Sequence, residues 1–470
     1  MHDSEYRTQD AIGLAELIAT GHVSATEVIE AALRRMEAVN PKLNAVILDL
    51  GDRALASVRK GPPTGPLAGV PFLIKDLSVS LAGTPTSAGS RAMGASPASA
   101  DSALVAKFKR AGLVPIGKSN TPEFGLEPVT EPERFGPTRN PWDLQRTPGG
   151  SSGGASAAVA AGIVPAAHAS DGGGSIRIPA SASGLFGLKP SRGRVSFAPA
   201  DEGWGGFSIH HAVTWSVRDS AALLDAICEP EPGDPYFLAP PAAPFLQSVS
   251  RDPKSLRIAF STAALASEAI DPECAEAVRE AARLCESLGH AVEEADLPGD
   301  YESVAQAAGT IVAASVAAML ESEGTRRGRP IQESELEAVS WATWKRGRQV
   351  AGSAYVQAVQ AAHAYGRSLA GFFARFDVLI TSTLGSPAIP IGRLRADPQA
   401  YAERLFAFMP NTQAFNVTGQ PAMSVPLAMS QGGLPIGVQF AARMGEEALL
   451  LALAGQLERA APWSGRRPEI

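Results

Sequence analysis

The chain contains little cysteine. Three residues, Cys228, Cys274 and Cys285, occur in 470. An odd number at these spacings matches neither a zinc-binding pattern nor a disulfide framework. We therefore expect buried free thiols in a reducing cytoplasm.

Basic runs are also missing. Lys and Arg total 41 against 48 Asp and Glu, which gives a formal net charge of −7, and no dense cluster of Lys or Arg occurs. Binding to a nucleic acid or to an anionic membrane surface depends on such a cluster. We expect neither as a partner.

Long hydrophobic runs are absent as well. The longest apolar stretches, around residues 155–164 and 310–320, are shorter than the roughly 20 residues that span a bilayer. The first residues show no basic start followed by an apolar run, which is the pattern of a secretory signal peptide. These features predict a cytoplasmic protein without membrane association.

The remaining composition is that of a globular protein, with 45% hydrophobic and 19% charged residues. Strand-like and helix-like segments alternate on both sides of a glycine-rich middle, which indicates one large α/β unit. Ser24 with Glu27 has the pattern of a capping box, and Asp271 with Pro272 that of a helix start. Within a single domain, 1–470, we expect a helical N-terminal region over about 1–60, a core over about 65–220, a helical lobe over about 230–375, and strands with a final helix over 376–470.

Two familiar motifs match by letter only. Residues 112–119, GLVPIGKS, fit the phosphate-binding P-loop, but a helix pattern precedes the first glycine and a strand pattern follows it. This is the reverse of the order that the loop requires. Residues 149–153, GGSSG, fit the G-x-S-x-G nucleophile elbow, but no strand leads into them and no histidine stands in a motif that would mark it as a base.

Two glycine–serine clusters remain, PGGSSGG around Ser151 and DGGGS ending at Ser175. Three glycines before a serine leave backbone N–H groups free to converge on an oxyanion, as acyl transfer requires. A nucleophilic serine also needs a base. Lys75, after the apolar segment VPFLI, is the candidate because burial favours the neutral form of a lysine. A surface lysine is the alternative reading.

Several segments together resemble the amidase signature family, in its order and spacing. They are GVPFLIKDL, GKSNTPEF, TRNPW, PGGSSGGASAAVAAG, SDGGGSIRIPASASGLFGLKPSRGRVS, FDVLITSTLGSPAIPIG and FNVTGQPAMSVPLA with GLPIGVQF. The resemblance covers about residues 8–460. It implies the amidase signature fold, an α/β structure whose large mixed sheet is flanked by helices on both faces.

The resemblance also implies a catalytic triad of the Ser–cis-Ser–Lys type. Carried over by motif, Ser175 is the nucleophile, Ser151 the bridging serine after a cis peptide bond, and Lys75 the base. The oxyanion hole would be formed by backbone N–H groups of the glycine run and the nucleophile: Gly172, Gly173, Gly174 and Ser175.

Five further residues follow from the same resemblance. Ser152, Asp171 and Arg177 would support the triad, while Gly125 and Leu126 would line the substrate pocket. No cofactor and no metal is expected.

The substrate is expected to be a small, neutral molecule, because no cationic cluster accompanies the signature. The segments TEPERFGPTRNPWDLQRTPGGSSGG and GRPIQESELEAVSWATWKRG look most similar to the branch of cyclic nylon-oligomer (6-aminohexanoate) hydrolases and general amidases. We expect a monomer or homodimer that hydrolyses amides, anilides or carbamates through an acyl-enzyme, with ester cleavage as a side activity. Two alternatives stay open: a glutamine amidotransferase-type subunit in a tRNA-dependent complex, and a non-catalytic binding module on the same fold.

Overall fold

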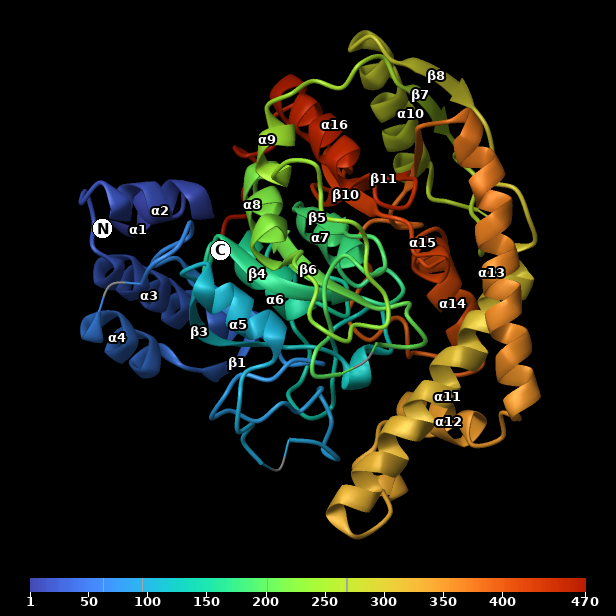
Figure 1. Cartoon of the computed structure of the whole chain (residues 1–470), viewed down its shortest axis with the longest axis horizontal. Coiled ribbons are helices and arrows are strands. Elements are labelled where there is room, and N and C mark those ends of the chain that lie inside the picture. The colour runs from blue at the N-terminus through green and yellow to red at the C-terminus, as the bar shows by residue number, and fades with distance from the viewer. Residues whose placement is uncertain (62, 95, 201, 268) are drawn as a thin grey trace.

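The computed structural model describes residues 1–470 except 62, 95, 201 and 268. Within the described residues, eleven strands form one sheet in the order β1-β3-β2-β4-β6-β5-β10-β11-β9-β7-β8 (Figure 1). The strands are β1 (Val46–Asp49), β2 (Pro71–Lys75), β3 (Val114–Ser119), β4 (Ala166–Asp171), β5 (Phe186–Lys189), β6 (Ile209–Thr214), β7 (Arg257–Phe260), β8 (Ala291–Glu294), β9 (Val378–Ser382), β10 (Ala422–Met429) and β11 (Pro435–Ala442).

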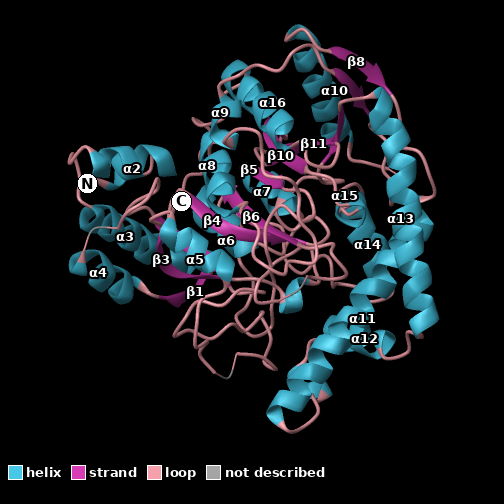
Figure 2. Ribbon diagram, in the orientation of Figure 1, coloured by secondary structure: helices cyan, strands magenta, loops and turns pink. Residues whose placement is uncertain are grey.

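Helices surround this sheet (Figure 2). They are α1 (Asp3–Tyr6), α2 (Ala11–Ala19), α3 (Ala25–Leu43), α4 (Gly51–Lys60), α5 (Ala103–Arg110), α6 (Gly153–Ala160), α7 (Arg177–Ser183), α8 (Val217–Ile227), α9 (Phe245–Val249), α10 (Pro272–Ser287), α11 (Tyr301–Arg327), α12 (Ala338–Gly347), α13 (Gly352–Arg375), α14 (Tyr401–Phe408), α15 (Ala414–Thr418) and α16 (Glu447–Ala460), with short 3-10 turns at Glu123–Gly125 and Glu333–Glu335.

The sheet is mixed and is covered on both faces. β2 runs parallel to β3 and β4, whereas β10 is antiparallel to β5 and β11. In β9, Val378 and Ile380 pack into the core that includes α10 and α16, while Leu379 packs into the core of α11, α13 and α15. Successive strand residues point to opposite faces, so the two sets of helices lie on opposite sides of the sheet. The expected α/β fold is confirmed.

Both predicted helix starts are present. The Ser24 hydroxyl accepts a hydrogen bond from the Glu27 N–H (3.2 Å), and the Glu27 carboxylate accepts one from the Ser24 N–H (2.8 Å). This reciprocal pair satisfies two of the donors that a helix end leaves open. At α10 the Asp271 carboxylate accepts from the Glu273 N–H, with Pro272 in the first turn.

The region expected to be a helical lobe also contributes strands. β7 and β8 extend the sheet beyond β9, although they lie within residues 230–375. Three of the four residues of β8 are exposed. An edge strand with one face in solvent lacks the apolar pattern that marks a buried strand, which explains why the sequence did not reveal it.

Helix α11 is long and apolar enough to cross a membrane by length and composition alone. This is weak evidence, because core helices of soluble proteins pass the same test. The apolar stretch around residues 310–320, which the sequence showed to be short, is the middle of this 27-residue helix. Here α11 packs against α12, α13 and α15, and in Figure 1 it runs beside α13 along one edge of the molecule.

Candidate active site

The predicted catalytic residues meet at one edge of the sheet. Lys75 ends β2 and Asp171 ends β4, and these two strands are parallel, so their carboxyl ends lie at the same edge. Ser151 precedes α6, and Ser175 stands in the turn between β4 and α7. Carboxyl ends of parallel strands are a common location for sites in α/β proteins.

The Lys75 ammonium group lies among three hydroxyls. Nζ is 2.8 Å from Ser151 Oγ, 2.9 Å from Ser152 Oγ and 3.0 Å from Ser170 Oγ. The side chain is fully buried. Burial lowers the pKa of Lys75 to about 7, although the Asp171 carboxylate opposes this shift. Lys75 is thus not the surface lysine of the alternative reading, and near neutral pH a large fraction of it is the free amine.

Ser151 and Ser175 are held on adjoining pieces of backbone. The Gly150–Ser151 peptide bond is cis, and the Ser152 N–H donates to the Ser175 carbonyl at 3.3 Å. Ser151 is connected to Lys75, but within the described residues no hydrogen bond joins the hydroxyls of Ser151 and Ser175. The first link of the predicted relay is therefore present in this structure and the second is not.

Asp171 and Arg177 form a fully buried ion pair next to the loop that carries Ser175. Arg177 Nη2 and Nε approach the two carboxylate oxygens at 2.9 and 3.0 Å. Burial would raise the pKa of Asp171, but Arg177 outweighs it and the pKa falls to about 2. The same carboxylate accepts the N–H groups of Gly174 (2.7 Å) and Ile176 (3.1 Å), so it holds the loop that carries Ser175.

This loop corrects one predicted role. The Gly174 N–H is bound to Asp171, so it is not free for an oxyanion. Gly174 has φ +137°, and a Cβ there would lie 2.4 Å from Thr412 Oγ1, which explains the glycine. Of the other predicted donors, Gly173 and Ser175 line the cavity described below, whereas a Cβ on Gly172 would meet the Trp204 ring.

Two residues near Lys75 were not predicted. Ser170 supplies the third hydroxyl, and His168 Nδ1 accepts a hydrogen bond from the Lys75 backbone N–H at 3.2 Å. His168 Nε2 in turn lies 3.1 Å from His210 Nδ1. Burial, together with nearby cationic groups, lowers the pKa of His168 well below its usual value. Both His168 and Ser170 lie on β4, two residues apart, and so point to the same face of the strand. This spacing, just before Asp171, is the sequence signal that could have identified them.

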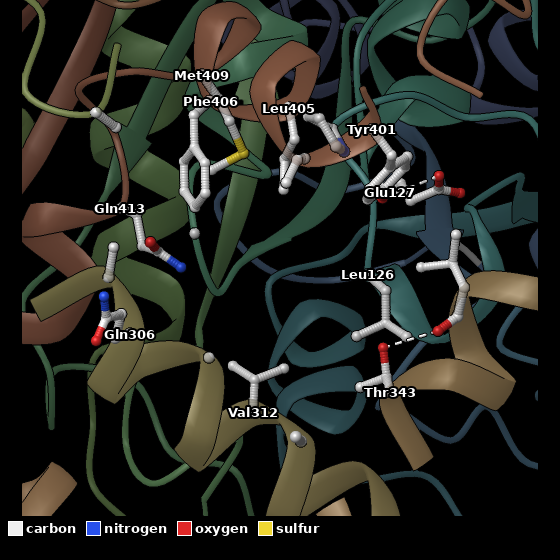
Figure 3. A pocket seen from close by; sticks show the side chains of 18 of the residues that line it. Leu126, Glu127, Gln306, Val312, Thr343, Tyr401, Leu405, Phe406, Met409 and Gln413 are labelled. Carbon is white, nitrogen blue, oxygen red and sulfur yellow. Dashed lines mark hydrogen bonds between the residues drawn. The ribbon is translucent and has the colours of Figure 1, made fainter. Parts of the chain in front are cut away.

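A cavity of about 820 Å³ opens in front of Ser175, and Gly125 and Leu126 both line it. Figure 3 shows two of its walls on opposite sides: Leu405, Phe406 and Met409, from the α14 segment, face Gln306 and Val312 of α11. The wall residues were missed because no motif marks them and they come from distant parts of the chain.

The P-loop-like segment has another role. It follows the end of α5 and leads into strand β3, in the order that the sequence indicated, and Lys118 Nζ is buried against the Asp76 carboxylate at 2.9 Å. A lysine held in this way is not available to a phosphate.

Comparisons with known proteins agree with this geometry. The sequence profile of the Amidase family matches residues 27–451. The chain is 41% identical to the 6-aminohexanoate-cyclic-dimer hydrolase of Paenarthrobacter ureafaciens, over 98% of this chain and 97% of that protein. The solved structure of a 6-aminohexanoate cyclic dimer hydrolase superposes with a TM-score of 0.93 (40% identity; 98% and 99% of the two chains). A bacterial aryl acylamidase of the amidase signature family gives 0.88 (28% identity; 97% of each chain). A match of this extent shows that the chain belongs to the amidase signature family and is an amide hydrolase.

Proposed function

We propose that this enzyme hydrolyses neutral amides, anilides and carbamates through a Ser175–Ser151–Lys75 triad and an acyl-enzyme. The observation that carries the proposal is the setting of Lys75. Its Nζ is buried, contacts Ser151 Oγ at 2.8 Å, and has a pKa of about 7. A base with a pKa near the working pH combines availability with driving force.

Hydrogen-bond accounting directs the lone pair of Lys75 toward Ser151. The Ser152 hydroxyl donates its proton to the Ser170 carbonyl (3.2 Å), so it can only accept from Lys75. A neutral amine has two N–H donors and one lone pair. With Ser152 and Ser170 accepting the two N–H groups, the lone pair is left for the Ser151 hydroxyl proton.

The proton moves toward Lys75 when Ser175 attacks, and it moves back from Lys75 when the leaving group departs. Lys75 takes the Ser151 proton as Ser151 takes that of Ser175, and Ser175 Oγ bonds to the carbonyl carbon. When the C–N bond breaks, Ser151 passes a proton to the leaving nitrogen and is reprotonated by Lys75. Water attacks the resulting ester by the same route and restores Ser175. The Ser151–Ser175 link forms in the substrate complex, since catalytic hydrogen bonds often tighten only there.

The cavity supports an uncharged substrate with a bulky apolar part. Its lining is mainly apolar, with Ile178, Val312, Leu405, Phe406 and Met409 among its residues. A volume of about 820 Å³ is ample for an oligomeric or aryl amide. The relative named above as a cyclic-dimer hydrolase supports nylon-type amides as candidates. A carbamate presents the same carbonyl to Ser175, which supports urethane and ester cleavage as further activities.

The test uses the protein purified alone. We expect turnover of at least one member of a panel of p-nitroanilides, nylon oligomers and aryl carbamates. A fluorophosphonate probe should label Ser175, as located by peptide mapping. Ser175→Ala should abolish both signals, and Ser287→Ala, at an exposed serine of α10, should leave them unchanged.

Two results would overturn the proposal. Reaction only with a glutamine donor and a tRNA-linked substrate, together with a stable partner, would favour the amidotransferase reading. Absence of labelling and of turnover in a folded protein would favour a binding module. A cytoplasmic location and a monomeric or homodimeric state stay predictions; fractionation of the source cells and light scattering would test them.

A further inference from the structure

A single arginine outside the triad binds two carboxylates from different walls of the cavity, and one of these carboxylates also binds a third wall. Arg395 lies between β9 and α14, and its Nε donates to Glu127 Oε1 at 2.9 Å. Its Nη2 contacts Glu127 Oε2 as well as Glu337 Oε2, the latter at 2.6 Å. The two carboxylate side chains are only 2% and 4% exposed, whereas Arg395 is 26% exposed.

Each partner of Arg395 belongs to a different wall. Glu127 follows Leu126 and lines the cavity with it. Glu337 directly precedes α12, which contributes Val339 and Thr343 to the lining.

The third wall is attached through Tyr401. This residue begins α14, and its hydroxyl donates to Glu127 Oε1 at 3.2 Å. Figure 3 shows Tyr401 and Glu127 together at one corner of the cavity, with Leu405 and Phe406 further along the wall.

The surroundings of Arg395 are strongly acidic. The Glu337 N–H donates to the buried Glu123 carboxylate at 2.8 Å, and the Glu337 carboxylate accepts the Glu133 N–H at 2.7 Å. Glu131 is partly buried, and within the described residues its Oε1 has no hydrogen-bond partner. In the described part of the chain, Arg395 is the only cation in ion-pair contact with Glu127 or Glu337. Without it, buried like charges would face one another and separate the walls.

We propose that Arg395 is a specificity-determining positioning residue, which sets the width of the substrate cavity by holding α12 and α14 against the loop at Leu126. It does not touch the reacting atoms. Removing it should loosen two walls at once, so slender substrates lose contacts and bulky substrates lose less. The kinetic part of this inference rests on the proposed hydrolase function.

The experiment compares Arg395→Gln with Arg393→Gln. Arg393 is exposed, lies two residues away and, within the described residues, makes no ion pair, so the charge change is matched. Hydrogen exchange of peptides covering 338–347 and 401–409 is read in both variants. We expect faster exchange in both peptides for Arg395→Gln only. This readout needs no substrate, so it stands apart from the test of the hydrolase function.

Kinetics give the second readout. For a slender p-nitroanilide we expect Arg395→Gln to raise KM about 10-fold with kcat within about 3-fold, and a bulky naphthyl analogue to lose less. Arg395→Lys keeps the charge but not the fork geometry, and should recover part of the KM. Equal behaviour of the 393 and 395 variants, or a fall in kcat shared by all substrates at unchanged KM, would overturn the proposal.

Glu337→Gln covers the case in which Arg395→Gln does not fold. It releases the α12 wall and leaves the bonds of Glu127 in place. Faster exchange in 338–347 but not in 401–409 supports the connection, and unchanged exchange in both peptides refutes it.

Discussion

The two sides of the cavity are held in different ways. On the sheet side, Lys75, Ser151 and Ser175 are 0%, 2% and 8% exposed. Lys75 ends β2, Ser151 lies just before α6 and Ser175 just before α7. On the helical side, Val312 and Leu405 are only partly buried and Gln306 is exposed. The helical side is held by long-range contacts such as that of Arg395 with Glu127. In the proposed function, the reacting groups therefore lie where side chains are most buried, and substrate selection takes place where they are more exposed.

The largest expected effect comes from removing the proposed base, Lys75, on the sheet side. Lys75→Ala should lower kcat by about 10³–10⁴-fold, because among the described residues Lys75 is the only basic side chain hydrogen-bonded to the Ser151 hydroxyl. The measurement is steady-state turnover with the fold checked by circular dichroism. Lys345→Ala, at an exposed lysine of α12 on the helical side, is the control. A Lys75→Ala variant that keeps a tenth of the activity would contradict Lys75 as the base.

The buried ion pair behind Ser175 should give the next largest effect. Arg177→Met leaves the Asp171 carboxylate buried without its partner, and we expect the free energy of unfolding to fall by about 3–5 kcal/mol. Urea denaturation at pH 7 measures this. Arg279→Met removes an exposed pair with Glu276 on α10 and should lower the free energy of unfolding far less, because water screens an exposed pair. Equal losses in the two variants would show that the buried Asp171–Arg177 pair contributes no more to the free energy of unfolding than an exposed pair.

The same contrast explains what the sequence could and could not predict. The side that holds Lys75, Ser151 and Ser175 lies in short motifs that resemble those of the amidase signature family, so these three residues could be named together from the sequence. The Gly174 N–H was wrongly predicted to belong to the oxyanion hole, because only the structure shows that the Asp171 carboxylate binds it. Arg395 and the α14 wall were not found, since side chains 268 residues apart in sequence meet only after folding. The edge strand β8 was missed because its exposed residues lack a period.

The pH dependence of the sheet side should be set by Lys75. Its amine is active when neutral, so with a pKa of about 7 the value of kcat/KM should rise about 10-fold per pH unit up to pH 7 and level off above it. Lys189 is the matched control, because burial lowers its pKa to about 7 as well, yet it does not contact the triad hydroxyls. The Lys189→Met variant should show the same rise of kcat/KM up to pH 7. A profile that is flat from pH 5 to 8 would contradict Lys75 as the base.

The smallest effect is expected on the helical side. Val312 faces the α14 wall across the cavity (Figure 3). Val312→Ala removes two methyl groups from the lining and so enlarges the cavity, while Ser175 is unchanged. We expect KM for apolar anilides to rise about 2–5-fold, the loss of roughly one to two buried methylenes at a partly open site, with kcat within about 2-fold. Val356→Ala, at an exposed position of α13, is the matched truncation and should change neither constant. If Val312→Ala instead lowered kcat 10-fold at constant KM, α11 would take part in positioning the reacting carbonyl, and the division of labour between the two sides would not hold.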